Sequence, residues 1–191
     1  VPMSWIRKAV TQGLRGHPDL ILLTGDYITD RIPSVAAYVD CLAGLAKAAP
    51  TYASLGNHDG GDWAAGAGGY ASTTNVEHML RQAGITVLKN QAVTVNVRGQ
   101  RLRLVGLGDL WATQFRPRKA FPAQTERLPT LVLSHNPDTK SALLKYDWDL
   151  LLCGHTHGGQ VVLPFVGAAA APVEDKQFVR GLQRWNGRWI H

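Results

Sequence analysis

Four short apolar runs in this chain of 191 residues each stop at a Gly or Ser that is followed by polar side chains. The runs begin at residues 20, 52, 131 and 150, and the last one reads LLLCGHTHGGQ. Apolar runs of this length bounded by turn residues are typical of buried strands. Parallel α/β sheets bind ligands beyond the carboxyl ends of their strands. The pattern therefore predicts an α/β fold in which four strand ends meet at one crevice.

The side chains that follow these runs have metal-ligand or proton-transfer chemistry: Asp26, Asn57, His58, His135, His155 and His157. Imidazole nitrogens bind zinc, iron and similar ions. Each residue taken singly has an ordinary structural role, such as Asp26 as a cap or Asn57 in a turn. Before Asn-Pro, His135 could equally be a hydrogen-bonded loop histidine. The coincidence at four predicted strand ends favours a shared metal site over separate structural roles.

Hydrophobic periodicity predicts helices at residues 4–14, 34–48 and 74–83, with Ser4 and Ser34 as the N-caps of the first two. The same reading predicts strands at residues 20–24, 51–55, 93–97, 102–107, 131–134, 150–152 and 161–163. Turns at residues 98–100 and 186–187 predict two hairpins. Because helix and strand alternate at the start of the chain, we expect a parallel sheet within one domain spanning residues 1–191.

Two long loops, at residues 59–73 and 109–127, carry aromatic and basic side chains. Loops of this length in a compact domain are usually functional or mobile. We expect Trp111 and Arg116 to contact substrate. The ordinary alternative for Trp111 is that it anchors its loop. The ordinary alternative for Arg116 is that it lies on a solvated surface.

The net charge of +6 suits a phosphate-bearing substrate, because opposite charge steers association. A nucleic acid or an anionic membrane surface would also fit this charge, so peripheral membrane association stays open. The basic residues do not form one block, and nucleic acid is not favoured. No apolar run approaches the roughly 18 residues of a membrane helix. Two cysteines make no disulfide framework, and the compartment stays open between cytoplasmic, membrane-associated and exported.

In chain order the motifs are GD at 25–26 with Asp30, GNHD at 56–59, His135, and GHTH at 154–157. Together they resemble the motifs of calcineurin-like metallophosphoesterases, over residues 19–160. The segments GLGDLW at 106–111, SHNPD at 134–138 and APVEDK at 171–176 resemble more narrowly a subgroup of bacterial phosphodiesterases. The resemblance implies a two-sheet sandwich flanked by helices, and a metal-dependent hydrolase of phosphoric esters.

The resemblance also implies a site for two divalent ions, which would be manganese, zinc or iron, with a metal-bridging hydroxide as the nucleophile. Asp26 would bridge the two ions. One ion would be completed by Asn57, His135 and His155. The other ion would be bound by His157.

For proton transfer, the resemblance implies that His58 protonates the leaving oxygen and that Asp59 orients His58. The family pattern opens with Asp-x-His on its first strand, and no such motif precedes Asp26 in this chain. We therefore expect that the given sequence lacks its first strand and is an incomplete domain. Such a chain would hold at most one well-formed metal site and would be nearly inactive.

Three functions stay open at this stage. The leading one is a phosphodiesterase that acts on a small phosphoester or a nucleotide-linked substrate. A second is a nucleotide–lipid pyrophosphatase of the UDP-diacylglucosamine type, acting at the membrane. The third is a non-catalytic metal-binding module, which the missing Asp-x-His supports and which His58 argues against, because an acid has little purpose without chemistry.

Overall fold

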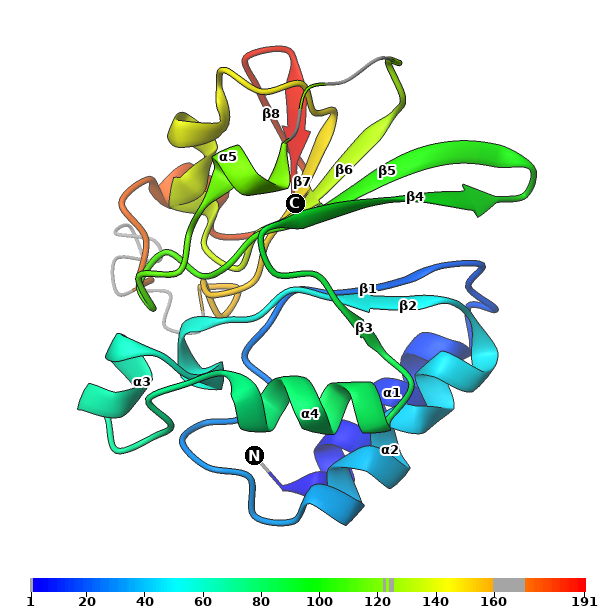
Figure 1. Cartoon of the computed structure of the whole chain (residues 1–191), viewed down its shortest axis with the longest axis vertical. Coiled ribbons are helices and arrows are strands. Elements are labelled where there is room, and N and C mark those ends of the chain that lie inside the picture. The colour runs from blue at the N-terminus through cyan, green and yellow to red at the C-terminus, as the bar shows by residue number, and fades with distance from the viewer. Residues whose placement is uncertain (1, 122, 124–125, 160–170) are drawn as a thin grey trace.

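The computed structural model describes residues 2–121, 123, 126–159 and 171–191, which form two sheets flanked by helices. Figure 1 shows a small sheet between two layers, with α1, α2 and α4 on one side and the larger sheet on the other. This arrangement confirms the two-sheet architecture expected from the sequence.

The small sheet is parallel and follows the order β1 (Ile21–Leu23), β2 (Thr51–Ala53) and β3 (Thr86–Val87). Parallel neighbours need crossover connections, which are usually helices. The helices of this half are α1 (Met3–Leu14), α2 (Val35–Ala48), the 3-10 turn η1 (Asn57–Asp59), α3 (Asp62–Gly66) and α4 (Thr74–Gln82). As expected, the Ser34 side chain caps α2 by accepting a hydrogen bond from the Ala37 backbone N–H.

The predicted cap of α1 is wrong, because Pro2 and not Ser4 occupies the N-cap position. Proline has no backbone N–H, but a residue at the start of a helix has no helical carbonyl to donate to, so no hydrogen bond is lost. The helix therefore begins at Met3, and Ser4 lies within its first turn.

The large sheet is mixed, with strands in the order β4 (Gln91–Val97), β5 (Gln100–Gly106), β6 (Thr130–Leu133), β7 (Leu150–Leu152), β9 (Arg188–Ile190) and β8 (Gln183–Trp185). Its central pairs, from β5 to β9, are parallel. The outer pairs are the two predicted hairpins, and both turns, Arg98-Gly99 and Asn186-Gly187, have the positive φ angles of the favoured two-residue turns.

Three short helices accompany this sheet: α5 (Pro117–Ala120), η2 (Pro137–Leu143) and η3 (Lys176–Phe178). The sequence did not predict α3, α5 or the two-residue strand β3, since each is too short to show a period. The predicted strand at residues 161–163 lies outside the described residues.

Each sheet has its own hydrophobic cluster. One joins the small sheet to α2 and α4 and includes Tyr38, Leu42, Leu55, Val76, Met79, Leu80 and Ile85. The other covers the large sheet and includes Val105, Leu107, Val132, Leu143, Trp148 and Leu151. These two clusters hold in place the strands whose ends carry the polar residues.

Among the described residues, no helix combines the length and apolarity needed to cross a membrane.

Candidate metal centre

Asp26 lies three residues beyond β1, in a turn that packs directly on the turn after β2. Its own φ is +59°, and Gly25 before it has a φ of +97°, so the chain reverses sharply here. A Cβ on Gly25 would collide with the backbone of Leu55 and Gly56, and a Cβ on Gly56 would collide with Asp26. Glycine at these two positions therefore lets the two strand-end turns touch.

A buried carboxylate, Asp59, joins these two turns. Its Oδ2 accepts hydrogen bonds from the backbone N–H groups of Asp26 and Gly56, both at 2.8 Å, and its Oδ1 accepts one from Tyr27 at 2.8 Å. Burial raises the pKa of Asp59 to about 7, against the pull of these N–H donors. The side chain thus holds the backbone that presents Asp26 and Asn57.

The expected contact between Asp59 and the His58 ring is wrong. The Nδ1 atom of His58 instead lies 2.5 Å from the carbonyl oxygen of Thr29, and its backbone N–H donates to Asp26 Oδ1 at 3.1 Å. The reason is that η1 turns the Asp59 side chain into the interior, where it is fully buried. The catalytic roles of His58 and Asp59 stay predictions.

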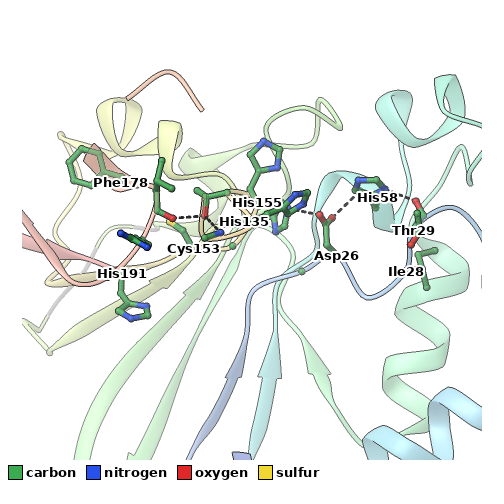
Figure 2. A pocket seen from close by; sticks show the side chains of 17 residues that line it. Asp26, Ile28, Thr29, His58, His135, Cys153, His155, Phe178 and His191 are labelled. Carbon is green, nitrogen blue, oxygen red and sulfur yellow. Dashed lines mark hydrogen bonds and ion pairs between the residues drawn. The ribbon is translucent and has the colours of Figure 1, made fainter. Parts of the chain in front are cut away.

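Two buried histidines from the large sheet face Asp26. After β6, His135 has its Nδ1 2.7 Å from the Thr24 carbonyl oxygen and its Nε2 3.0 Å from Asp26 Oδ2. After β7, His155 has its Nδ1 2.9 Å from Asn57 Oδ1. Figure 2 shows both rings beside Asp26, with His58 on the other side of that carboxylate. Side chains from all four strand ends are therefore brought together.

Ionisation at the site follows from these contacts. Burial by itself would raise the pKa of Asp26. The hydrogen bond and the charge interaction with His135 more than offset this effect, so the Asp26 pKa lies below its usual value. Burial likewise disfavours a charged His135, but its contacts with Asp26 raise the pKa above its ordinary value. Burial, together with the neighbouring His135, lowers the pKa of His155 to about 4. At neutral pH the site therefore offers an ionised Asp26 and a neutral His155, the forms that bind metal, whereas His135 would release its proton to bind an ion.

This donor set fits a divalent cation. Ligand-type atoms of Asp26, His135 and His155 all lie within 4.8 Å of one another. Bonds of about 2.0–2.1 Å place neighbouring ligands of a tetrahedral ion roughly 3.3 Å apart, close to the 3.0 Å between His135 Nε2 and Asp26 Oδ2. Within the described part of the chain, the Nε2 of His155 has no hydrogen-bond partner, and that of His135 contacts only Asp26. Unpartnered buried nitrogens of this kind suit a metal ligand.

Beside the cluster lies a cavity of about 720 Å³, whose walls include Asp26, His58, His135, His155 and His157. The imidazole of His157 is exposed and is not part of the three-residue cluster. His58 and His157, the remaining predicted histidines, therefore line the same cavity as the three-residue cluster.

The remaining residues with ligand or substrate chemistry near these motifs lie in different surroundings. Asp30 is exposed and bonds the neighbouring Arg31 backbone. Arg116 is also exposed, donates to the Phe115 carbonyl at 2.9 Å and does not line the cavity. Cys153 does line it, but burial raises the pKa of this thiol, which disfavours the thiolate that a metal needs. Trp111 is not among the residues that line the cavity, but its ring meets the His155 ring at 4.3 Å between centroids.

Several residues around the site were not predicted. The carbonyls of Thr24 and Thr29 carry no side-chain signal, because any residue offers the same acceptor. Buried Asp109 accepts from Ala112 N–H at 2.8 Å, and its Oδ2 has no partner among the described residues. Asp109 belongs to the GLGDLW segment already noted in the sequence, which follows a fifth apolar run after β5.

Comparison with known proteins gives one matching family. The model of the calcineurin-like phosphoesterases matches residues 4–159. Phosphodiesterase YaeI of Escherichia coli is 46% identical over 100% of this chain and 68% of its own length. The UDP-2,3-diacylglucosamine pyrophosphatase LpxG of Chlamydia trachomatis is 27% identical over 95% of this chain and 68% of its own length. A 5′-nucleotidase precursor from Thermus thermophilus has a TM-score of 0.40 at 15% identity, covering 84% of this chain and 37% of its own.

Proposed function

The chain belongs to the calcineurin-like phosphoesterase family, which makes it a metal-dependent phosphoesterase, and we propose that it cleaves phosphodiesters. The observation that carries this proposal is the cluster of Asp26, His135 and His155, in which each residue comes from a different strand end. The 46% identity to a protein named as a phosphodiesterase favours a diester over other phosphoesters.

We assign one ion to Asp26, Asn57, His135 and His155, whose donor atoms already approach one another. For a second ion the described residues offer Asp26 and His157. Manganese, zinc and iron all suit such mixed carboxylate and imidazole donors. Divalent ions bound here would polarise a phosphoryl oxygen and provide a nucleophile at neutral pH by acidifying water.

His58 serves as the general acid in this proposal. A carbonyl oxygen only accepts hydrogen bonds, so the contact with Thr29 places a proton on Nδ1 of His58. The Nε2 atom is then the one that exchanges a proton with the leaving oxygen. The His58 side chain lines the cavity while its backbone bonds Asp26, so the acid and the metal cluster share one wall.

A second candidate is hydrolysis of a nucleotide–lipid pyrophosphate at a membrane surface. The similarity to LpxG favours it, although at 27% identity. A lipid-linked substrate would agree with peripheral membrane association and with the net charge of +6. We place this candidate second because the identity to the phosphodiesterase is higher over more of the chain.

Metal stripping tests the proposed function directly. The purified chain, treated with a chelator and dialysed, should regain on addition of Mn²⁺ or Zn²⁺ the slow hydrolysis of bis(p-nitrophenyl) phosphate that is expected from one well-formed metal site. Calorimetric titration with the same ions should count at least one tight equivalent, and a second equivalent would support the role of His157. A chain that binds no ion would contradict the proposed enzyme activity and would favour a binding role that needs no metal. Faster cleavage of UDP-linked diacylglucosamine than of diesters would favour the second candidate.

A further inference from the structure

Two tryptophans from the long loops pack against histidine rings at the metal cluster. Trp63 packs against His58 with 4.4 Å between ring centroids, and Trp111 packs against His155 at 4.3 Å. The two indoles lie 6.2 Å apart and are tilted by 38°. A row of four aromatic rings thus runs from the proposed acid to a metal-binding histidine.

The two loops that carry these tryptophans are fastened to each other. The Thr113 hydroxyl donates to the Asp62 carboxylate, and the Gln114 side chain donates to the Gly60 carbonyl at 3.5 Å. A Cβ on Gly61 would press against Ala112 and Gln114, so the backbone of one loop packs closely on the side chains of the other. Neither tryptophan is therefore carried on a loop that stands alone.

A second brace fixes the Trp111 loop to the body of the protein. The Asn90 amide donates to the Gln114 carbonyl at 2.8 Å and accepts from the N–H groups of Gly108 and Arg116 at 3.0 and 2.9 Å. Asp109 holds the turn that contains Trp111 by accepting a hydrogen bond from the Ala112 backbone N–H. The indoles are thus held in place before a substrate arrives, which lowers the entropy cost of binding.

Part of this aromatic surface remains open to a ligand. Trp111 is 38% exposed although its edge meets His155, and Trp63 is half-buried. Two indoles 6.2 Å apart offer the area of a planar ring system and not the length of an acyl chain. Flat rings gain from stacking on such surfaces, and a nucleobase on an aromatic side chain does so without needing a particular sequence.

We propose that Trp63 and Trp111 form a stacking shelf that selects phosphodiesters carrying a nucleoside, whose flat base stacks beside the scissile phosphate. The proposal rests on the proposed phosphodiesterase function and adds the class of substrate. The phosphate lies at the metal cluster, and the planar group lies on the indoles next to His58 and His155.

Two substrates with the same leaving group test the shelf: thymidine 5′-(p-nitrophenyl) phosphate and methyl p-nitrophenyl phosphate. Replacing Trp111 or Trp63 by Leu should raise KM for the thymidine substrate, relative to the methyl one, by roughly 5- to 150-fold, the range of one base–aromatic stack. Trp111→Phe keeps a ring and should restore most of the preference. Trp5→Leu, on the 64% exposed tryptophan of α1, is the matched control.

Binding measurements keep the test independent of turnover. With Mn²⁺ present, the wild-type chain should bind adenosine 5′-monophosphate more tightly than ribose 5-phosphate by calorimetry, and Trp111→Leu should abolish the difference. Equal loss on both substrates or both ligands, or an unchanged preference, would overturn the shelf. Failure of the proposed function looks different, because the wild type would then release no nitrophenolate from either diester while the binding preference could still be read.

Discussion

The two halves of the molecule hold their metal-site residues in different ways. The small-sheet half, residues 2–88, presents Asp26, Asn57 and His58 from turns that one internal carboxylate, Asp59, ties together. The large-sheet half, residues 91–191, presents His135 and His155, whose Nδ1 atoms bond to atoms of the other half. The first half is therefore organised by itself, and the second takes the orientation of its imidazoles from the first.

This asymmetry shows where the geometry of the site originates. Thr24 and Asn57, both in the small-sheet half, are the acceptors that face the two imidazoles. Damage to the turns of the small-sheet half should reach every ligand. Damage within the large-sheet half should stay with the histidine nearest to it. The following changes test that difference, from the largest expected effect to the smallest.

The greatest loss is expected at Asp26, where the halves meet. Asp26→Ala removes a carboxylate that contacts both His135 and the His58 backbone, so bound metal and nearly all hydrolysis should disappear. The loss should exceed the roughly 10- to 100-fold cost of removing an outer-sphere partner. Metal content by mass spectrometry and the rate on bis(p-nitrophenyl) phosphate measure it. Asp30→Ala, on an exposed carboxylate four residues away, is the control. Wild-type metal content in Asp26→Ala would rule out the assigned site.

His58→Gln should lower the rate of hydrolysis and leave the amount of bound metal unchanged. A general acid is worth roughly 10²- to 10⁴-fold in rate when the leaving alkoxide is poor. The loss should therefore be large on an alkyl diester and small on a nitrophenyl diester, with bound metal retained. His78→Gln, on an exposed histidine of α4, should change neither rate. Equal losses on both diesters together with lost metal would make His58 a ligand instead.

A matched pair of changes tests the asymmetry itself. Asp59→Asn leaves buried backbone N–H groups facing an amide NH₂, so we expect a loss of metal affinity of roughly 10- to 100-fold and a lower free energy of unfolding. In the other half, the Thr156 hydroxyl donates to Val179 at 2.7 Å and accepts from Gly158 at 3.2 Å. Thr156→Val should weaken metal binding less than Asp59→Asn. Equal losses in the two variants would remove the distinction between the halves.

The smallest effect is expected away from the site, in the large sheet. Hydrogen bonding to Arg127 lowers the pKa of Asp149, and the Thr130 N–H adds to this against partial burial. Since the folded-state pKa is lowered, the stabilisation is present above the unfolded pKa of about 3.9 and is lost as pH falls through the folded-state value. Asp149→Asn should cost up to about 1 kcal/mol at pH 7, because the pair is largely exposed.

Unfolding in urea between pH 7 and pH 2.5 checks this prediction. The wild type and Asp149→Asn should converge in stability at the acid end. Metal affinity should be equal in the two at pH 7. A difference in stability that persists at the lowest pH would mean that the carboxylate charge is not the cause.

The strand ends could be predicted because apolar runs stopped by Gly are strong local signals, as at Gly25 and Gly56. The contacts around His58 could not. Sequence adjacency suggested Asp59 as its partner, yet a three-residue 3-10 turn points the two side chains apart, and the true acceptor is a backbone carbonyl. The contact of Trp63 with the His58 ring was also hidden, since Trp63 lies among glycines where no period exists.

The contact between Gly25 and Gly56 has a consequence for how such a protein can diversify. With no side chain between the two turns, the distance from Asp26 to Asn57 is set by backbone thickness alone. Almost any larger residue at Gly25 or Gly56 would move both ligands at once, so substitutions can change this spacing very little. The loops around Trp63 and Trp111 have close glycine contacts of their own, as at Gly61, but these contacts lie between the loops and not between the two metal ligands. New substrate preferences can therefore arise at the rim while the reactive centre is inherited unchanged.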